Sequence, residues 1–169
     1  MIIRKLTTDD TENYFDMLCR LDEETEFMMY EPGERREKTK DLARLKAVIE
    51  AAASGPDLLL VAVSEDGEIA GFIWAEKGKL NRVLHTAYIV VGIRKAWQHQ
   101  GIGTQFFDLL DEWARVSGVI RLELTVECAN TTARSLYEKH GFTVEGRRPK
   151  SMNVNGTLVD EYYMGRIIE

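Results

Sequence analysis

The sequence predicts one domain of the mixed α/β class, with a central mixed sheet of six to seven strands flanked by about four helices. The chain has 169 residues, which suits a single domain with a full hydrophobic core. Some segments carry apolar residues at three-to-four spacing, as helices do, and others alternate or run continuously, as strands do. Antiparallel hairpin patterns come first and alternating helix and strand patterns follow, which predicts a sheet covered by helices on both faces.

The N-terminal part predicts a strand and two helices before the main sheet. A strand over 2–6 leads into a helix over 7–24, whose opening threonines and aspartates are suited to capping. A Pro-Gly pair marks 25–37 as a loop, and a second helix follows over 38–53.

The rest of the chain predicts most of the sheet. Its apolar run over 82–93 is continuous and indicates a central strand. The expected elements are strands at 57–64 and 69–76 around a turn, the central strand, a helix at 101–118, a strand at 120–126, a helix at 130–141, and strands at 142–148 and 157–168. We expect a single domain over 1–169, divided into an N-terminal part (1–56), a core (57–145) and C-terminal strands (146–169).

Composition excludes several classes of protein. The net charge is −6, which argues against binding to nucleic-acid backbones. Two cysteines make neither a disulfide framework nor a metal-ligand pattern, so we expect no metal. The N-terminus lacks the apolar stretch of a signal peptide, and no apolar run approaches the ~18 residues of a membrane span. We therefore expect a cytoplasmic protein with no membrane or nucleic-acid partner.

The stretch "QHQGIG" at 98–103 has the features of an anion site. It follows the central strand and opens a helix, where backbone N–H groups are unpaired and Gly101 and Gly103 leave them accessible. A Walker loop would need a lysine before Thr104, and a dinucleotide fingerprint would need glycine where Phe106 stands. A glycine-rich helix start that binds nothing stays open on these residues alone.

The wider segment "IVVGIRKAWQHQGIG" resembles the acetyl-CoA-binding motif of the GNAT family of N-acetyltransferases. Ile93 fills its strand end, and Gln98, Gly101 and Gly103 fill its three defined positions. The resemblance implies a GNAT-like fold in which loop amides hold the pyrophosphate of coenzyme A. The implied binding residues are Gln98, His99, Gln100, Gly101, Ile102, Gly103 and Thr104.

A second segment, "LTVECANTTARSLYEKHGF", resembles the other signature of the same family. The matching residues are Asn130, Ala133, Leu136, Tyr137, Gly141 and Phe142. The resemblance implies that Tyr137 is the general acid that protonates the departing thiolate and that Asn130 binds the pantetheine arm. A phenol suits this role because it is protonated at pH 7. A core tyrosine and a plain helix cap are the alternatives.

The strand ending at Ile93 and the strand at 120–126 are strands 4 and 5 of the expected sheet. A bulge at Gly92 would splay them into a fork and expose the backbone of Val91 and Ile93. A pantetheine arm can pair with that backbone as an added strand does, and an N–H there can polarise the thioester carbonyl.

The group that deprotonates the incoming amine is less clearly marked. Many members of the family carry an acidic residue five positions before the strand-end residue, and here that position is Tyr88. His85 on the same strand, a chain of waters or Glu127 are the other candidates, and Tyr88 itself is expected to line the acceptor site.

The C-terminal segment resembles the branch of small acetyltransferases that act on free amino acids. Similar tails occur in enzymes that act on polyamines and on ribosomal-protein N-termini, so the acceptor is a small-molecule or peptide amine. An acidic segment at 22–34 could attract its ammonium group, and the aromatic tail at 161–168 could pair two subunits into a homodimer. A non-catalytic coenzyme A sensor and an α/β domain for another phosphate ligand remain as alternative functions.

Overall fold

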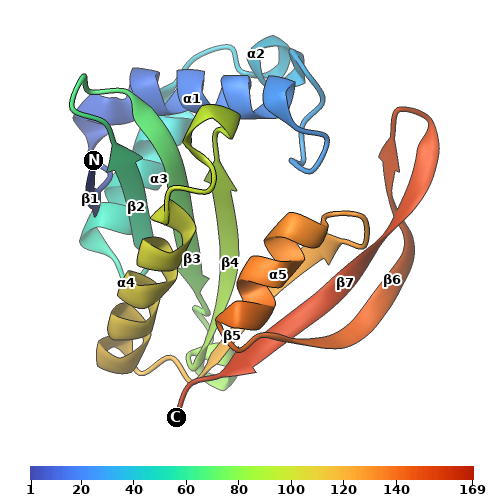
Figure 1. The fold of residues 1–169 in the computed structure, drawn as a ribbon. Coiled ribbons are helices and arrows are strands. Elements are labelled where there is room, and N and C mark those ends of the chain that lie inside the picture. The colour runs from blue at the N-terminus through green and yellow to red at the C-terminus, as the bar shows by residue number, and fades with distance from the viewer. The chain divides into compact units, whose positions relative to one another are not determined.

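A computed structural model describes all residues from 1 to 169, and it confirms a mixed α/β fold with seven strands and five α-helices (Figure 1). The elements are β1 (Ile2–Lys5), α1 (Thr11–Glu24), α2 (Glu34–Lys38), α3 (Ala43–Ser54), β2 (Leu58–Val63), β3 (Ile69–Lys77), β4 (Thr86–Ile93), α4 (Ile102–Ser117), β5 (Arg121–Glu127), α5 (Thr131–Lys139), β6 (Thr143–Val154) and β7 (Thr157–Ile167). Short 3₁₀ turns precede α1, β4 and α4.

The seven strands are ordered β1-β2-β3-β4-β5-β7-β6. β4 and β5 run parallel, whereas β1 with β2, β2 with β3, β5 with β7 and β6 with β7 are antiparallel pairs. The register between β4 and β5 covers only Thr86 to Tyr88 on β4 and Arg121 to Glu123 on β5. Parallel pairing of β4 and β5 within an otherwise hairpin-rich sheet explains why α4 is needed as a crossover between them.

The chain divides into two compact units. The first contains residues 1–76 and 90–106, and the second contains residues 77–89 and 107–169. Each of β4 and α4 therefore contributes residues to both units.

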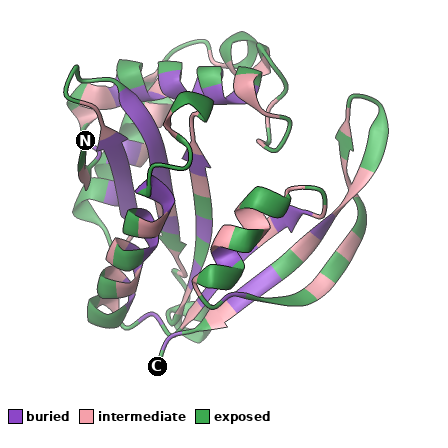
Figure 2. Cartoon of the chain, in the orientation of Figure 1, coloured by how far each residue is buried: buried purple, intermediate pink, exposed green.

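The core of the first unit lies between β2, β3 and the helices α1 and α3. Five consecutive residues of β2 are buried, as expected for a strand covered on both faces (Figure 2). Tyr14 of α1 meets Phe72 of β3 edge to face, with ring centroids 5.6 Å apart. The apolar face that α1 turns inward explains the three-to-four spacing of its sequence.

The apolar residues of β5 in the second unit lie on one face of the strand. On β5, Leu122 and Leu124 are buried, while their neighbours Arg121 and Glu123 are partly exposed. Arg166 of β7 pairs in register with Leu122 and forms a two-bond ion pair with Asp111 of α4, so α4 packs against the buried face. Arg121 and Glu123 therefore lie on the other, more open face of β5.

Several element boundaries differ from the sequence-based expectation. The expected loop at 25–37 contains most of α2, because Gly33 takes a left-handed conformation (φ +83°) and starts a helical turn that a Glu34–Lys38 ion pair stabilises. The second long helix begins at Ala43 instead of residue 38, where Asp41 accepts a hydrogen bond from the Ala43 amide.

The C-terminal hairpin is longer than expected, since β6 continues through Pro149 to Val154. An irregularity in the register between Arg148 and Met152 accommodates the proline, and Asp160 of β7 accepts from the Lys150 amide. Figure 1 shows β6 and β7 as one long antiparallel pair.

Both cysteines are free: Cys19 is buried and Cys128 is partly exposed. None of the helices combines the length and the apolar character that crossing a bilayer requires.

Candidate active site

The segment between β4 and α4 forms a compact loop in the first unit. The Gln98 side chain folds back and donates to the carbonyl of Ile93 at 3.0 Å, and Gln100 does the same to Ala96 at 3.1 Å. His99 and Gly101 both have positive φ angles, +60° and +81°. Glycine suits the second position, since the left-handed region carries little cost for a residue without Cβ.

The start of α4 presents unpaired amides. The first hydrogen bond of the helix runs from the Gln105 amide to the Gly101 carbonyl, so the amides of Ile102, Gly103 and Thr104 have no acceptor one turn earlier. The positive end of the helix dipole lies at the same place. This end of α4 has the chemistry to hold an anionic group such as a phosphate.

The end of β4 packs tightly against the first unit's core. Val91 and Ile93 are half-buried, and the Arg94 amide donates to the Ala70 carbonyl at 2.9 Å. A Cβ on Gly92 would lie 2.9 Å from atoms of Leu21 and Phe72, so close packing explains this glycine. The bulge expected at Gly92 stays a prediction.

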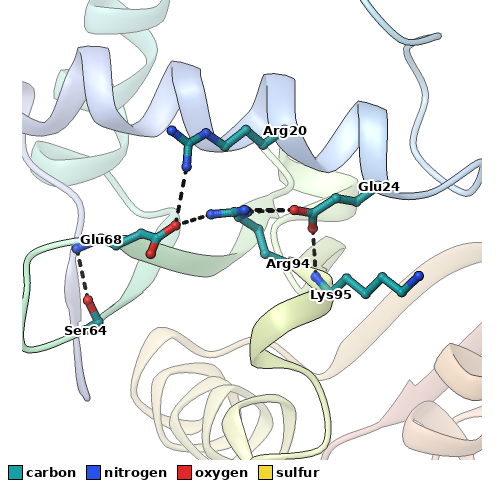
Figure 3. Close-up of polar contacts among 6 residues, drawn as sticks. All are labelled: Arg20, Glu24, Ser64, Glu68, Arg94 and Lys95. Atoms are coloured by element: carbon teal, nitrogen blue, oxygen red, sulfur yellow. Dashed lines mark hydrogen bonds and ion pairs between the residues drawn. The ribbon is translucent and has the colours of Figure 1, made fainter.

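A cluster of charged groups fixes the beginning of the loop (Figure 3). Glu24, the last residue of α1, accepts from Arg94 Nε at 3.1 Å and Nη2 at 2.8 Å through one oxygen. Its other oxygen accepts from the Lys95 amide at 2.7 Å. Arg94 also forms an ion pair with Glu68, which accepts from Arg20 at 3.4 Å. Glu24 was one of the acidic residues expected to attract an amine, and the structure gives it an internal partner instead.

Tyr137 lies on α5 in the second unit, among aromatic side chains. Its ring meets Phe107 and Phe142 with centroids 5.8 and 6.1 Å apart, and the residue is 7% exposed. Burial raises the pKa of its phenol, and the nearby Tyr88 raises that pKa further. The phenol is therefore protonated at neutral pH.

Asn130 caps the N-terminus of α5, which was one of its two expected roles; the other was binding of the pantetheine arm. Its side-chain oxygen accepts from the Ala133 amide at 3.1 Å. This hydrogen bond uses the oxygen of the side chain and not its amide nitrogen.

Tyr88 lies within β4, whereas His85 lies just before the strand. Tyr88 lies on the open face of β4, and its hydroxyl is hydrogen-bonded to that of Thr125 on β5 at 2.8 Å. The expectation that His85 lies on the same strand is wrong, because β4 begins at Thr86. A 3₁₀ turn at Asn81–Val83 precedes β4, and Thr86 Oγ1 donates to the Val83 carbonyl. His85 is exposed, and its carbonyl pairs with the amides of Ile120 and Arg121.

Sequence reasoning missed a cluster on the open face of the second unit, around Arg121. Arg121 Nε donates to Glu123 at 2.9 Å and Nη1 donates to Glu145 at 3.0 Å. The Arg121 guanidinium lowers the pKa of the Glu145 carboxyl. These groups line a hollow of about 370 Å³, which we call the β5 hollow. Its lining residues are Tyr88, Arg121, Glu123, Leu124, Glu145, Tyr163 and Met164.

A signal for this cluster was present in the stretch "RLELTV". Its polar residues alternate with apolar ones, which predicts a polar face on the strand. Glu145 lies 22 residues after Glu123, and only the pairing of β6 and β5 with β7 brings the two together.

Known structures share this fold over nearly the whole chain. An acetyltransferase of the GNAT family from Streptococcus pneumoniae superposes with a TM-score of 0.91 at 28% identity, covering 99% of both chains. An acetyltransferase from Salmonella typhimurium, solved with its cofactor acetyl-CoA, has the same fold, with a TM-score of 0.85 at 21% identity over 100% of this chain and 94% of that one. The strand order and the β4–α4 loop thus define the fold of an N-acetyltransferase.

The sequence identifies the family. Residues 15–142, most of the chain, match the acetyltransferase (GNAT) family, and the chain belongs to it. The L-amino acid N-acetyltransferase AaaT of Escherichia coli (strain K12) is 30% identical over 122 residues, which are 70% of this chain and 74% of that protein. The protein is an N-acetyltransferase.

Proposed function

We propose that the protein transfers the acetyl group of acetyl-CoA to the primary amine of a small acceptor, and that the acceptor is a free amino acid. The observation that carries the donor is the β4–α4 loop with its three unpaired amides at the start of α4. The similarity to an L-amino acid N-acetyltransferase supports the acceptor.

Coenzyme A is bound through the backbone of the first unit. The amides from Gln98 to Thr104 hold the pyrophosphate, which the positive end of the α4 dipole also attracts. The backbone of Val91 and Ile93 pairs with the amides of the pantetheine arm as an added strand does. When bound, acetyl-CoA supplies the reactive thioester.

The acceptor amine attacks the thioester carbonyl directly, without a covalent enzyme intermediate. Tyr137 donates its proton to the departing thiolate. Its buried phenol is protonated across the neutral range. Asn130 binds the pantetheine arm with its amide nitrogen, which the capping hydrogen bond does not use.

Tyr88 forms part of the acceptor wall in this proposal. Its side chain is 41% exposed and lines the β5 hollow, where a small amine has room to lie. His85 is exposed outside β4 and does not line that hollow, so we give it no step in the transfer.

Thiol release tests the activity. Purified protein and acetyl-CoA are incubated with amino acids, polyamines and short peptides, and free coenzyme A is measured. We expect release with one or more amino acids. Binding of acetyl-CoA without acetylation of any amine would show instead a coenzyme A sensor.

The substitution Tyr137→Phe tests the acid. We expect kcat to fall about 100-fold, within the range for general acid–base catalysis, with little change in acetyl-CoA binding. Tyr30→Phe is the matched control, since it keeps the ring that Arg35 stacks on and should leave kcat unchanged. Equal turnover of the Tyr137→Phe and wild-type enzymes would rule out the acid role.

A further inference from the structure

The β5 hollow combines the groups that an amine acceptor needs. Two carboxylates and one guanidinium line it, so its ionised side chains carry a net charge of about −1, which favours a cation. The phenol rings of Tyr88 and Tyr163 form parts of its wall. Tyr163 is 48% exposed, so the hollow is open to a ligand from solvent.

The two carboxylates are held differently. Both oxygens of Glu145 contact Arg121, and this pairing lowers its pKa. Only one oxygen of Glu123 accepts from Arg121, and its side chain is 40% exposed. Glu123 is therefore the carboxylate with an oxygen available for an ammonium group.

Glu123 also lies beside Tyr88. It is the register partner of Tyr88 across the parallel pair of β4 and β5, so the two side chains share a face. The Tyr88 phenol in turn acts electrostatically on Tyr137. The hollow and Tyr137 both belong to the second unit.

We propose that the β5 hollow is the acceptor site, that it takes a small amine which is cationic at neutral pH, and that Glu123 accepts the proton of its ammonium group. This inference rests on the proposed acetyl transfer and adds the residue that prepares the nucleophile. Arg121 keeps the Glu123 carboxylate in place, and Tyr88 and Tyr163 flank the amine.

The protons and bonds balance in this scheme. Glu123 takes one proton from the ammonium group and later releases it to solvent. The neutral nitrogen attacks the thioester carbon, the C–N bond forms, the C–S bond breaks, and Tyr137 gives its proton to the thiolate. The nitrogen loses a second proton as the amide forms, and an equivalent proton returns to the Tyr137 phenolate.

A proton acceptor matters because the free amine is scarce at pH 7. Amino groups titrate between about 8 at a chain terminus and about 10.4 in a lysine side chain, so most acceptor molecules arrive protonated. The groups facing Glu123 are Arg121 on its own strand, Tyr88 on β4, Glu145 on β6 and Tyr163 on β7. Among them Glu145 is the other carboxylate, and its pairing with Arg121 lowers its pKa.

The test is the substitution Glu123→Gln, which keeps an oxygen for Arg121 but accepts no proton. The kcat/KM for the amine is measured from pH 6 to 10 with the best acceptor found in the thiol-release panel. At pH 7 we expect a loss of about 100-fold, as for removal of a general base, with the KM for acetyl-CoA unchanged. The loss should shrink as the pH approaches that of the amine's own titration, because the neutral amine then needs no base.

Two controls separate the possible outcomes. Glu112→Gln on the exposed side of α4 makes the same chemical change away from the hollow and should match wild type. Glu145→Gln should cost less than Glu123→Gln at pH 7. A Glu123→Gln enzyme with wild-type kcat/KM at pH 7, or with a loss that is equal at every pH, overturns the role of Glu123. A wild-type protein that acetylates no amine overturns the proposed function itself.

Discussion

Replacing Glu24 by glutamine should loosen the start of the β4–α4 loop. The Glu24 side chain is 24% exposed and the Arg94 side chain only 13%, so the pair is largely removed from water. Glu24 receives three hydrogen bonds, two from Arg94 and one from the Lys95 amide. The groups that contact the Glu24 carboxylate are all hydrogen-bond donors, and a carboxylate can accept from each of them because it carries only acceptors.

The size of the effect follows from what glutamine lacks. If its carbonyl stays with Arg94, its NH₂ group faces the Lys95 amide, and two donors then oppose each other. A hydrogen bond to a charged group contributes about 1.5–3 kcal/mol. Arg94 keeps its ion pair with Glu68, so we expect the free energy of unfolding to fall by about 2 kcal/mol.

Urea unfolding and hydrogen exchange measure this change. The Lys95 amide should exchange faster in the Glu24→Gln protein, and the KM for acetyl-CoA should rise about tenfold, which corresponds to about 1.4 kcal/mol. Glu23→Gln is the matched control: it is the preceding residue, exposed on α1, and should change stability by less than about 0.5 kcal/mol. Unchanged unfolding and unchanged exchange at Lys95 would refute the idea that Glu24 holds the loop.

Two further substitutions test packing and charge in the first unit. Gly92→Ala should lower the free energy of unfolding by about 1–3 kcal/mol, since its new methyl group would lie 2.9 Å from buried Leu21 and Phe72; a neutral result in urea would show that both side chains yield freely. Two hydrogen bonds from Arg4 at 2.7 Å lower the pKa of Asp10 to about 2. Because the folded-state pKa is below the unfolded value near 3.9, this pair stabilises the protein above pH 4 and the benefit is lost as the pH falls toward 2. Asp10→Asn should therefore cost about 1 kcal/mol at pH 7, after allowance for solvent screening, and progressively less in acid, as pH-dependent melting would show.

The periodicity of the sequence predicted most elements because it reflects burial. The alternation in β5 and the three-to-four spacing in α1 each reflect which side chains meet a core, and both elements formed close to the expected residues, although α1 begins at Thr11 instead of residue 7. Boundaries were less predictable where local contacts decide them. Gly33 was expected to break structure, yet its left-handed backbone starts α2.

The candidate site could likewise be predicted only in part from the sequence. The place of Gln98 and Gly101 just before α4 could be predicted from sequence, because a helix start depends mainly on neighbours along the chain. The bond from Glu24 to Arg94 spans 70 residues, and no local pattern indicates it.

The sequence by itself determined the fold class, the family motifs and the loop at the start of α4, since each depends on residues within one helix, strand or turn. Only the tertiary structure shows which groups each carboxylate contacts. Glu24 was expected near an amine and is bound to Arg94, whereas Glu123, with no motif around it, lines the β5 hollow beside Tyr88. The physical reason is that a carboxylate's role depends on the charges and donors around it, and here those come from strands distant in the chain.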